Sequence, residues 1–208
     1  MVSGLFIAIE GPEGAGKTTL VERLAQRIRG VGLNVLEVRE PGGTTTAEAA
    51  RNLVLDPGQD WSSVAELFLI LTARAELVEK VLRPALADSS TVVISDRFDL
   101  STEAYQIAGR DLPRSEVLAA NQLATGGLRP DLTLILDLMP EEGRARQRAQ
   151  GKEPDRLELE DAAYHHRVAQ AFRSAEGPGI VHLDGTRTAD ELEEAAWETV
   201  RVLLDGTE

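Results

Sequence analysis

Residues 5–18 read L-F-I-A-I-E-G-P-E-G-A-G-K-T, and this stretch decides the fold. Its first six residues are almost continuously apolar, which is typical of a β-strand buried on both faces of a parallel sheet. From residue 18 to residue 29 the apolar side chains recur at helical spacing and predict an amphipathic helix. The segment between them, G-P-E-G-A-G-K-T at 11–18, matches the phosphate-binding pattern G-x-x-x-x-G-K-[ST] in full. A strand, a glycine-rich loop and a helix in this order predict a P-loop fold.

Each fixed position of this loop has a physical reason. Glycines permit backbone conformations and a close approach that a side chain would block. Successive N–H groups can then surround phosphate oxygens, and the following helix turns its positive end towards the same anion. Lys17 is expected to reach the β- and γ-phosphates of a nucleoside triphosphate, and Thr18 to bind Mg²⁺ through its hydroxyl. The predicted nucleotide-binding set is Gly11, Pro12, Glu13, Gly14, Ala15, Gly16, Lys17 and Thr18.

The rest of the chain continues the alternation of short apolar runs and longer helical patterns. This alternation predicts an α/β fold with a five-stranded parallel sheet and helices on both faces. Further strands are expected at residues 34–38, 91–95, 132–137 and 179–183. Besides the helix at 18–29, helices are expected at 63–87, interrupted or ended near Pro84, and at 190–204.

Length and composition limit the possible classes. The 208 residues fit a single domain spanning 1–208, and 42% of them are hydrophobic, enough for a full core. A net charge of −13 argues against a nucleic-acid partner but allows a small anionic ligand in a locally basic pocket. The chain has no cysteine, hence no disulfide or thiolate metal site. No signal-like start and no apolar run of about 20 residues is found, so we expect a cytoplasmic protein without a membrane partner.

A P-loop does not specify a reaction, because ATPases, GTPases, motors and small-molecule kinases share it. The guanine-specifying pattern N-K-x-D is absent from the sequence, which disfavours a nucleotide-switched GTPase module. Three further motifs follow: R-E-P-G-G at 39–43, D-R-F at 96–98 and S-T-E-A-Y-Q at 101–106. In this order behind a P-loop, they resemble the motifs of bacterial thymidylate kinases. The resemblance runs from Phe6 to the last predicted helix.

The resemblance implies a nucleoside monophosphate kinase fold that transfers a phosphoryl group from ATP, with Mg²⁺, to dTMP in dTTP synthesis. It also implies a homodimer, for which the 63–87 helix is a candidate contact surface. One alternative is another nucleoside or deoxynucleoside monophosphate kinase with a relaxed base preference. A second is an inactive relative that acts as a scaffold, although intact Lys17, Thr18, Asp96 and Arg97 argue against it.

Charged residues follow two predicted strands at the sheet edge where open α/β sheets bind ligands. Arg39 and Arg97 can each hold phosphate oxygens in a bidentate fork. By the resemblance, Arg97 lies between the donor and acceptor phosphates, and Arg39 and Arg51 hold the dTMP phosphate; a surface salt bridge is the alternative for Arg51. Asp96 ends an apolar strand, where an acid commonly holds the Mg²⁺ shell, so Asp96 and Thr18 form the predicted metal site.

The resemblance also assigns a site for the base and sugar. Arg74 in T-A-R-A is placed against thymine, whose O4 accepts hydrogen bonds. An aromatic residue usually stands one helical turn earlier and stacks on the base, but this chain has Ile70 there, which either packs against the pyrimidine or belongs to the core. Further contacts are assigned to Thr102 and Gln106 at the base edge, Tyr105 beneath the deoxyribose and Glu13 near the 3′-hydroxyl. A helix start with polar surface groups is the alternative for these four.

Residues 143–156, G-R-A-R-Q-R-A-Q-G-K-E-P-D-R, form a dense basic stretch that predicts a mobile lid. The family carries an extra basic residue either in the P-loop or in the lid, and this P-loop has Glu13 and no arginine. Arg148 is therefore expected to contact the transferred phosphate, with Arg156 next, and the other basic residues of the segment are Arg144, Arg146 and Lys152. A solvated basic helix face is the alternative for any single one of them.

The expected chemistry needs no general base. A phosphate monoester has its second pKa near about 6, so the acceptor is mostly a dianion at neutral pH. Catalysis then depends on holding two anions in line and neutralising the charge between them. Lys17, Arg97 and Arg148 are the predicted catalytic residues, and His165, His166 and His182 are expected to be surface or structural.

Overall fold

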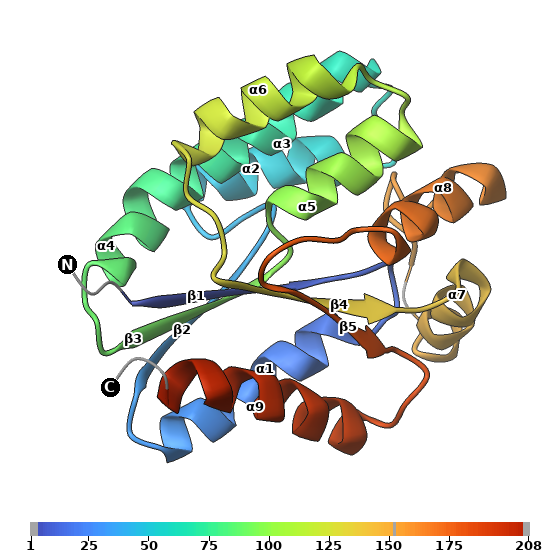
Figure 1. Ribbon diagram of the computed structural model, residues 1–208. Helices are drawn as coiled ribbons and strands as arrows, with labels where there is room; N and C mark the ends of the chain where they lie inside the picture. Colours follow the sequence, from blue (N-terminus) through green and yellow to red (C-terminus); the bar gives the residue numbers. More distant parts are fainter. Residues whose placement is uncertain (1–3, 152, 206–208) are drawn as a thin grey trace.

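The computed structural model describes residues 4–151 and 153–205, in which a parallel five-stranded sheet lies between two layers of helices (Figure 1). The strands are β1 (Leu5–Glu10), β2 (Asn34–Arg39), β3 (Thr91–Asp96), β4 (Leu132–Asp137) and β5 (Ile180–Asp184). Their order across the sheet is β2-β3-β1-β4-β5, and every neighbouring pair is parallel. The predicted α/β class and five parallel strands are thus confirmed.

Helices cover the two faces of the sheet unequally. One face carries α1 (Lys17–Gly30) and α9 (Ala189–Asp205), which lie side by side below the sheet in Figure 1. The other face carries α2 (Thr45–Leu55), α3 (Ser63–Leu77), η1 (Val78–Leu82), α4 (Arg83–Leu86), α5 (Asp99–Thr102), η2 (Glu103–Gly109), α6 (Arg114–Thr125) and α8 (Ala162–Arg173). The remaining helix, α7 (Pro140–Ala149), follows β4 and contains the first half of the predicted lid.

The alternation of side chains along β1 builds a core on each face of the sheet. Ile7 and Ile9 are fully buried against α1 and α9, whereas Phe6 packs on the opposite side against Leu77 and Leu82. Successive side chains of a strand point to opposite faces, so only a continuous apolar run can fill both cores. Full burial of such a side chain contributes about 1.5–3 kcal/mol. The apolar run that precedes the phosphate loop therefore anchors it in the centre of the sheet.

The helix predicted at 63–87 is continuous in direction but changes type along its length. The α-helical part ends at Leu77, and a π-helical turn then leads into a final α-helical turn that contains Pro84. The N–H of Arg83 bonds the carbonyl of Val78, five residues back. Proline lacks an N–H, and its ring would clash with the carbonyl four residues earlier. The wider turn accommodates the proline, so the predicted interruption is a π-helical turn and not an end.

The strand register brings the functional motifs to one edge of the sheet. Both Ile9 in β1 and Arg39 in β2 pair with Asp96 in β3. The next residue, Arg97, has a φ of 73°, a left-handed conformation uncommon for a residue other than glycine. Ser95 fixes this turn because its hydroxyl donates to the Arg97 carbonyl at 2.6 Å. The chain thus leaves β3 abruptly and turns the Arg97 side chain towards the phosphate loop.

None of the helices within residues 4–151 and 153–205 has both the length and the apolar composition needed to cross a bilayer.

Candidate active site

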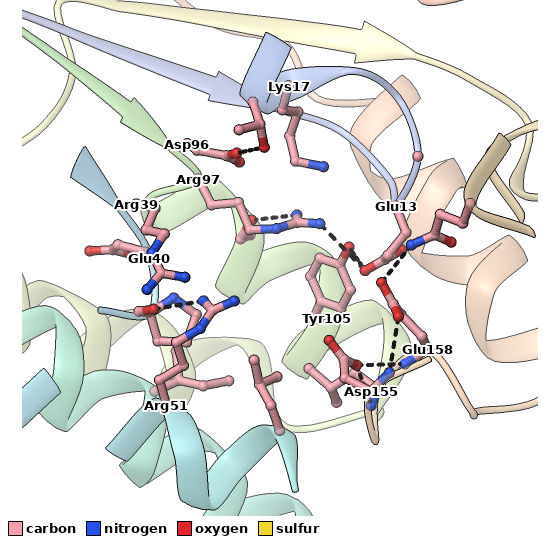
Figure 2. A pocket seen from close by; sticks show the side chains of 18 of the residues that line it. Glu13, Lys17, Arg39, Glu40, Arg51, Asp96, Arg97, Tyr105, Asp155 and Glu158 are labelled. Carbon is pink, nitrogen blue, oxygen red and sulfur yellow. Dashed lines mark hydrogen bonds and ion pairs between the residues drawn. The ribbon is translucent and has the colours of Figure 1, made fainter. Parts of the chain in front are cut away.

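A cavity of about 480 Å³ opens at the carboxyl edge of the sheet, between the phosphate loop, the ends of β2 and β3, α3, η2 and the lid (Figure 2). Most of the predicted site residues line it: Glu13, Gly14, Gly16, Lys17, Thr18, Arg39, Arg51, Ile70, Arg74, Asp96, Arg97, Thr102, Tyr105 and Gln106. Six others do not: Gly11, Pro12, Ala15, Arg144, Arg148 and Arg156. The structure therefore gathers residues from distant motifs around one space large enough for a small ligand.

The phosphate loop places its lysine and its hydroxyl at the cavity. Lys17 Nζ donates to the carbonyls of Gly11 at 3.1 Å and Pro12 at 2.8 Å. Burial and the nearby Arg97 lower the Lys17 pKa to about 8. Thr18 Oγ1 donates to Asp96 Oδ2 at 2.7 Å, so the two predicted metal ligands are in contact.

The Arg97 guanidinium lies at the centre of the cavity wall (Figure 2). Its Nη1 donates to the Gly11 carbonyl and to Ser101 Oγ, both at 3.1 Å, and its Nη2 lies 3.4 Å from Glu13 Oε1. The guanidinium also stacks over Tyr105, 4.9 Å from the ring centroid. The Tyr105 hydroxyl donates to Glu13 in turn. Although burial opposes it, the charges of Arg97 and Lys17 hold the Glu13 pKa below its usual value.

Glu10 is a site residue that the sequence prediction missed. It ends β1, is fully buried, and accepts hydrogen bonds from the Phe98 and Ser101 backbone N–H groups at 2.8 and 3.1 Å and from Ser101 Oγ at 2.6 Å. Burial raises its pKa to about 7, against the opposing charge of Arg97. Glu10 thereby clamps the turn that carries Arg97 to the strand that carries the phosphate loop. An acid at the end of an otherwise apolar strand was the sequence signal for this role.

Two arginines form a second cationic group, across the cavity from the phosphate loop (Figure 2). Arg39 Nη2 contacts both carboxylate oxygens of Glu48, at 3.0 and 3.1 Å, and Arg51 Nη1 donates to the Pro41 carbonyl at 2.8 Å. Burial and the positive charge of Arg39 lower the Arg51 pKa. Two cations held near each other at a cavity wall are suited to bind an anion such as a phosphate.

Arg74 is buried to 1% exposure and its guanidinium is surrounded by protein acceptors. Nε and Nη2 contact Glu40 Oε2 at 2.7 and 2.6 Å, and Nη2 also donates to the Phe98 carbonyl at 2.8 Å. Nη1 donates to Thr102 Oγ1 at 2.5 Å and to Asn121 Oδ1 at 2.7 Å. These contacts match the five N–H donors of a guanidinium. The thymine contact of Arg74 stays a prediction. Its buried partner Glu40 belongs to the R-E-P-G-G motif, but no contact between the two residues was predicted from the sequence.

Ile70 and Phe68 point in different directions from α3. Ile70 lines the cavity and is 9% exposed, whereas Phe68 is 58% exposed and lies outside the cavity lining. Thr102 and Gln106 also line the cavity, contact the α3 residues Arg74 and Glu66 respectively, and are both buried to 1% exposure. The subsite predicted for a base is thus formed by an aliphatic side chain and two polar side chains.

The lid presents a different arginine from the one predicted. Arg146 lines the cavity, and its Nη2 donates to the Gly185 carbonyl at 2.9 Å, while Nη1 lies 3.5 Å from the Gly14 carbonyl. Arg148 is exposed and does not line the cavity. Two residues along an α-helix turn the side chain by about 200°. The helical phase of α7 therefore directs Arg148 away from the phosphate loop when Arg146 faces it.

The other predicted lid contacts are engaged with the protein. Arg144 Nη2 donates to the Glu160 carbonyl at 3.2 Å. Arg156 Nε donates to the Val54 carbonyl at 2.8 Å, and its Nη2 contacts Glu66 Oε2 at 2.6 Å. Arg156 thus fastens the end of the lid to α2 and α3, and the structure does not bring it to the phosphate loop. Lys152 lies outside the described residues.

The parallel sheet in the order β2-β3-β1-β4-β5, with a phosphate loop after β1 and a cavity at its carboxyl edge, defines the fold of a P-loop nucleoside monophosphate kinase. The sequence profile of the family described as Thymidylate kinase matches residues 9–196. The chain belongs to the thymidylate kinase family.

Curated thymidylate kinases are similar in sequence to this chain over nearly its whole length. A thymidylate kinase of Deinococcus radiodurans is 46% identical over 203 residues, covering 96% of this chain and 98% of the relative. One from Pseudomonas fluorescens is 43% identical over 208 residues, covering 98% of each chain. One from a Synechococcus strain is 45% identical over 203 residues, covering 96% of each.

Proposed function

We propose that this protein transfers the γ-phosphoryl group of ATP to the 5′-phosphate of dTMP. The observation that carries the proposal is the separation of two cationic groups within one cavity, Lys17 on one side and Arg39 with Arg51 on the other. A triphosphate on the phosphate loop and a monophosphate at the arginines would then meet at Arg97, which lies between them (Figure 2). Membership of the thymidylate kinase family supports dTMP as the acceptor.

The residues around the reacting phosphates act mainly through charge and position. The acceptor phosphate is mostly a dianion at neutral pH and needs no general base. Arg97 would face both phosphates, and its contact with Glu13 and its stacking on Tyr105 restrict its orientation. Lys17 and Arg146 add positive charge on the donor side. Preorganised cations of this kind stabilise the charge that spreads over the transferred group.

Thr18 and Asp96 fit a magnesium site. Their side-chain oxygens are 2.7 Å apart at the cavity. Mg²⁺ is commonly bound by one or two protein oxygens, with substrate phosphates and water completing its shell, so a larger acidic cluster is not required. The described residues contain no group of three or more His, Cys, Asp or Glu side chains that could hold a metal by itself. When bound, Mg²⁺ would neutralise phosphate charge.

A panel of nucleoside monophosphates with MgATP tests the function. We expect dTMP to give the highest kcat/KM, because the family relationship favours thymine; higher turnover of dCMP or dGMP would support the alternative of a kinase with relaxed base preference.

Lys17→Ala should lower kcat by about a thousandfold or more while the fold survives, since removal of a charge aimed at the transition state is costly. Lys80→Ala is the matched control, because Lys80 is exposed and, within the part of the chain that the structure describes, forms an ion pair only with Glu76 on the surface of η1 and α3.

We also propose a homodimer, formed through α3 and α6 and working in the cytoplasm, where its nucleotide substrates occur. Val64 and Phe68 on α3 and Leu123 on α6 are exposed by 49%, 58% and 85%. Large exposed apolar side chains on neighbouring helices are typical of an interaction surface. Phe68→Arg should shift sedimentation towards a monomer. Val202→Arg, on the opposite side of the sheet, should leave the sedimentation coefficient unchanged; a monomeric wild-type protein would contradict the proposal.

A further inference from the structure

A buried carboxylate behind the base subsite has no role in the reaction described above. Glu66, in the first turn of α3, has 0% exposure. Its Oε1 accepts from Gln106 Nε2 at 3.0 Å, and its Oε2 contacts Nη2 of Arg110 at 2.7 Å and Nη2 of Arg156 at 2.6 Å. Arg110 also reaches Glu160 at 2.6 Å. Although burial opposes it, the hydrogen bonds from Arg110 and Arg156 hold the Glu66 pKa below its usual value.

The charge of Glu66 decides which end of the Gln106 amide faces it. An ionised carboxylate accepts hydrogen bonds and cannot donate one. Gln106 must therefore turn its NH₂ group towards Glu66, which leaves its carbonyl oxygen as the group available to the cavity. No hydrogen bond to that oxygen is present within residues 4–151 and 153–205. Gln106 consequently presents a hydrogen-bond acceptor, its side-chain carbonyl oxygen, to the cavity.

Thr102 supplies the complementary group four residues earlier on the same wall. Its oxygen already accepts from Arg74 Nη1 at 2.5 Å, so the hydroxyl proton is free to be donated. Thymine and uracil present O4, an acceptor, beside N3–H, a donor. Cytosine presents the reverse pair, an N4 amino donor beside an N3 acceptor. A donor at Thr102 and an acceptor at Gln106 match the first pattern and oppose the second.

We propose that Glu66 is a positioning residue for base selection: by fixing the Gln106 amide with its oxygen towards the cavity, it makes the site select a base with an N3–H donor. This inference rests on the proposed nucleoside monophosphate kinase function and adds a specificity determinant to it. Glu66 acts through Gln106 and does not touch the substrate. Its contact with Arg156 also ties the end of the lid to the same carboxylate.

Glu66→Gln tests the proposal with almost no change of size. A glutamine can offer either its oxygen or its NH₂ group to Gln106, so the Gln106 amide can turn over. We expect the ratio of kcat/KM for dTMP over dCMP to fall by about tenfold or more, since a mismatched hydrogen-bonding group at a base is strongly discriminated against. dUMP shares O4 and N3–H with dTMP, so kcat/KM for dUMP should change in parallel with kcat/KM for dTMP. Calorimetric binding of dTMP and dCMP without ATP should show the same loss of discrimination.

Two further variants distinguish a positioning role of Glu66 from a purely structural one. Arg156→Met removes the lid contact with Glu66 but leaves the bond from Gln106 Nε2, so it should alter KM values without changing the dTMP to dCMP ratio. The double variant Glu66→Gln, Gln106→Glu restores an obligatory acceptor at residue 106, because the glutamine at 66 can donate to it. The double variant should recover most of the wild-type preference for dTMP over dCMP. It also keeps the total charge of the pair, so it provides a test even if the single variant folds poorly.

The outcomes are distinct. A wild-type protein that does not phosphorylate dTMP would overturn the proposed function itself. Active wild-type protein together with a folded Glu66→Gln variant that loses activity equally on dTMP, dUMP and dCMP would overturn the positioning role alone and show that Glu66 is only structural. Failure of the double variant to recover the ratio would likewise contradict the proposed role of Gln106 polarity.

Discussion

The backbones of Gly14 and Gly143 lie so close that a Cβ atom on Gly14 would be 2.3 Å from the carbonyl oxygen of Gly143. A Cβ atom on Gly143 would be 2.1 Å from the carbonyl oxygen of Glu13. The first turn of α7 therefore packs directly against the phosphate loop, without side chains between them. This contact fixes the start of the lid relative to the loop and sets the direction of every side chain on α7.

Gly143→Ala should separate these two backbones. Alanine is about 1 kcal/mol better than glycine within a helix, but backbone atoms at 2.1 Å must move, and such overpacking costs about 1–3 kcal/mol. We expect KM for ATP to rise by about tenfold and thermal stability to fall. Gly30→Ala is the control, because no atom of the described residues lies within 4 Å of the added methyl group, apart from its chain neighbours and the backbone of its own helix, and its φ is not positive; it should be neutral or stabilising. An unchanged KM for ATP in Gly143→Ala would show that the loop tolerates the displacement.

Arg146 and Arg148 should differ in their effect on phosphoryl transfer. Arg146 lines the cavity beside Gly14, whereas Arg148 faces solvent. We expect Arg146→Met to lower kcat/KM for ATP by about a hundredfold, a size typical for loss of one preorganised charge. Arg148→Met should change it less than threefold, as for a solvated surface charge. Steady-state kinetics at saturating dTMP measure both, and the reverse ranking would show that the helix turns or moves when nucleotide binds.

Ile70→Phe should tighten dTMP binding. Ile70 faces the cavity one helical turn before Arg74, and a phenyl ring there can stack on the base, which adds about 0.5–1.5 kcal/mol over aliphatic packing. This corresponds to a dissociation constant about two- to tenfold lower, measurable by calorimetry. Ile70→Leu controls for volume without a ring and should leave the constant nearly unchanged. Weaker binding of the phenylalanine variant would mean that the base does not reach residue 70.

Glu10 should make stability depend on pH in a specific window. Its pKa is about 7 in the folded protein and 4.5 ordinarily, so between these values the folded state holds a proton that the unfolded state has lost. The free energy of unfolding then falls as pH rises from about 4.5 to about 7, by up to roughly 3 kcal/mol. Above about pH 7 the contribution of Glu10 no longer changes with pH. Glu10→Gln keeps the shape and removes the titration. Urea unfolding at pH 5 and pH 8 should show a smaller loss of unfolding free energy for the variant than for the wild-type protein. Equal losses in both proteins would exclude Glu10 as the cause.

Local motifs were the part of the site that could be predicted. The order of strand, glycine-rich loop and helix specified Lys17 and Thr18, and an acid at the end of an apolar strand specified Asp96. The structure brings Thr18 and Asp96 together although they are 78 residues apart. Their meeting was predictable because parallel strands bring their carboxyl ends to one sheet edge.

Partners that depend on long-range packing could not be predicted. Glu66 meets Arg156 across 90 residues, and Glu10 meets the backbone of Ser101 across 91. Both acids stand among apolar residues, in S-V-A-E-L-F-L-I and in L-F-I-A-I-E. Such a setting is a weak sign of a buried and therefore partnered carboxylate, but it does not say which partner.

The sequence by itself determined the fold class, the phosphate loop and the family, because these follow from residue order and from short-range periodicity in the backbone. Only the tertiary structure decided that Arg146 rather than Arg148 faces the cavity, that Arg74 is enclosed by protein acceptors, and that Glu66 orients Gln106. The physical reason is that a side chain's direction and its buried partners depend on how whole elements pack. Here the close contact of Gly14 with Gly143 sets the phase of the lid helix.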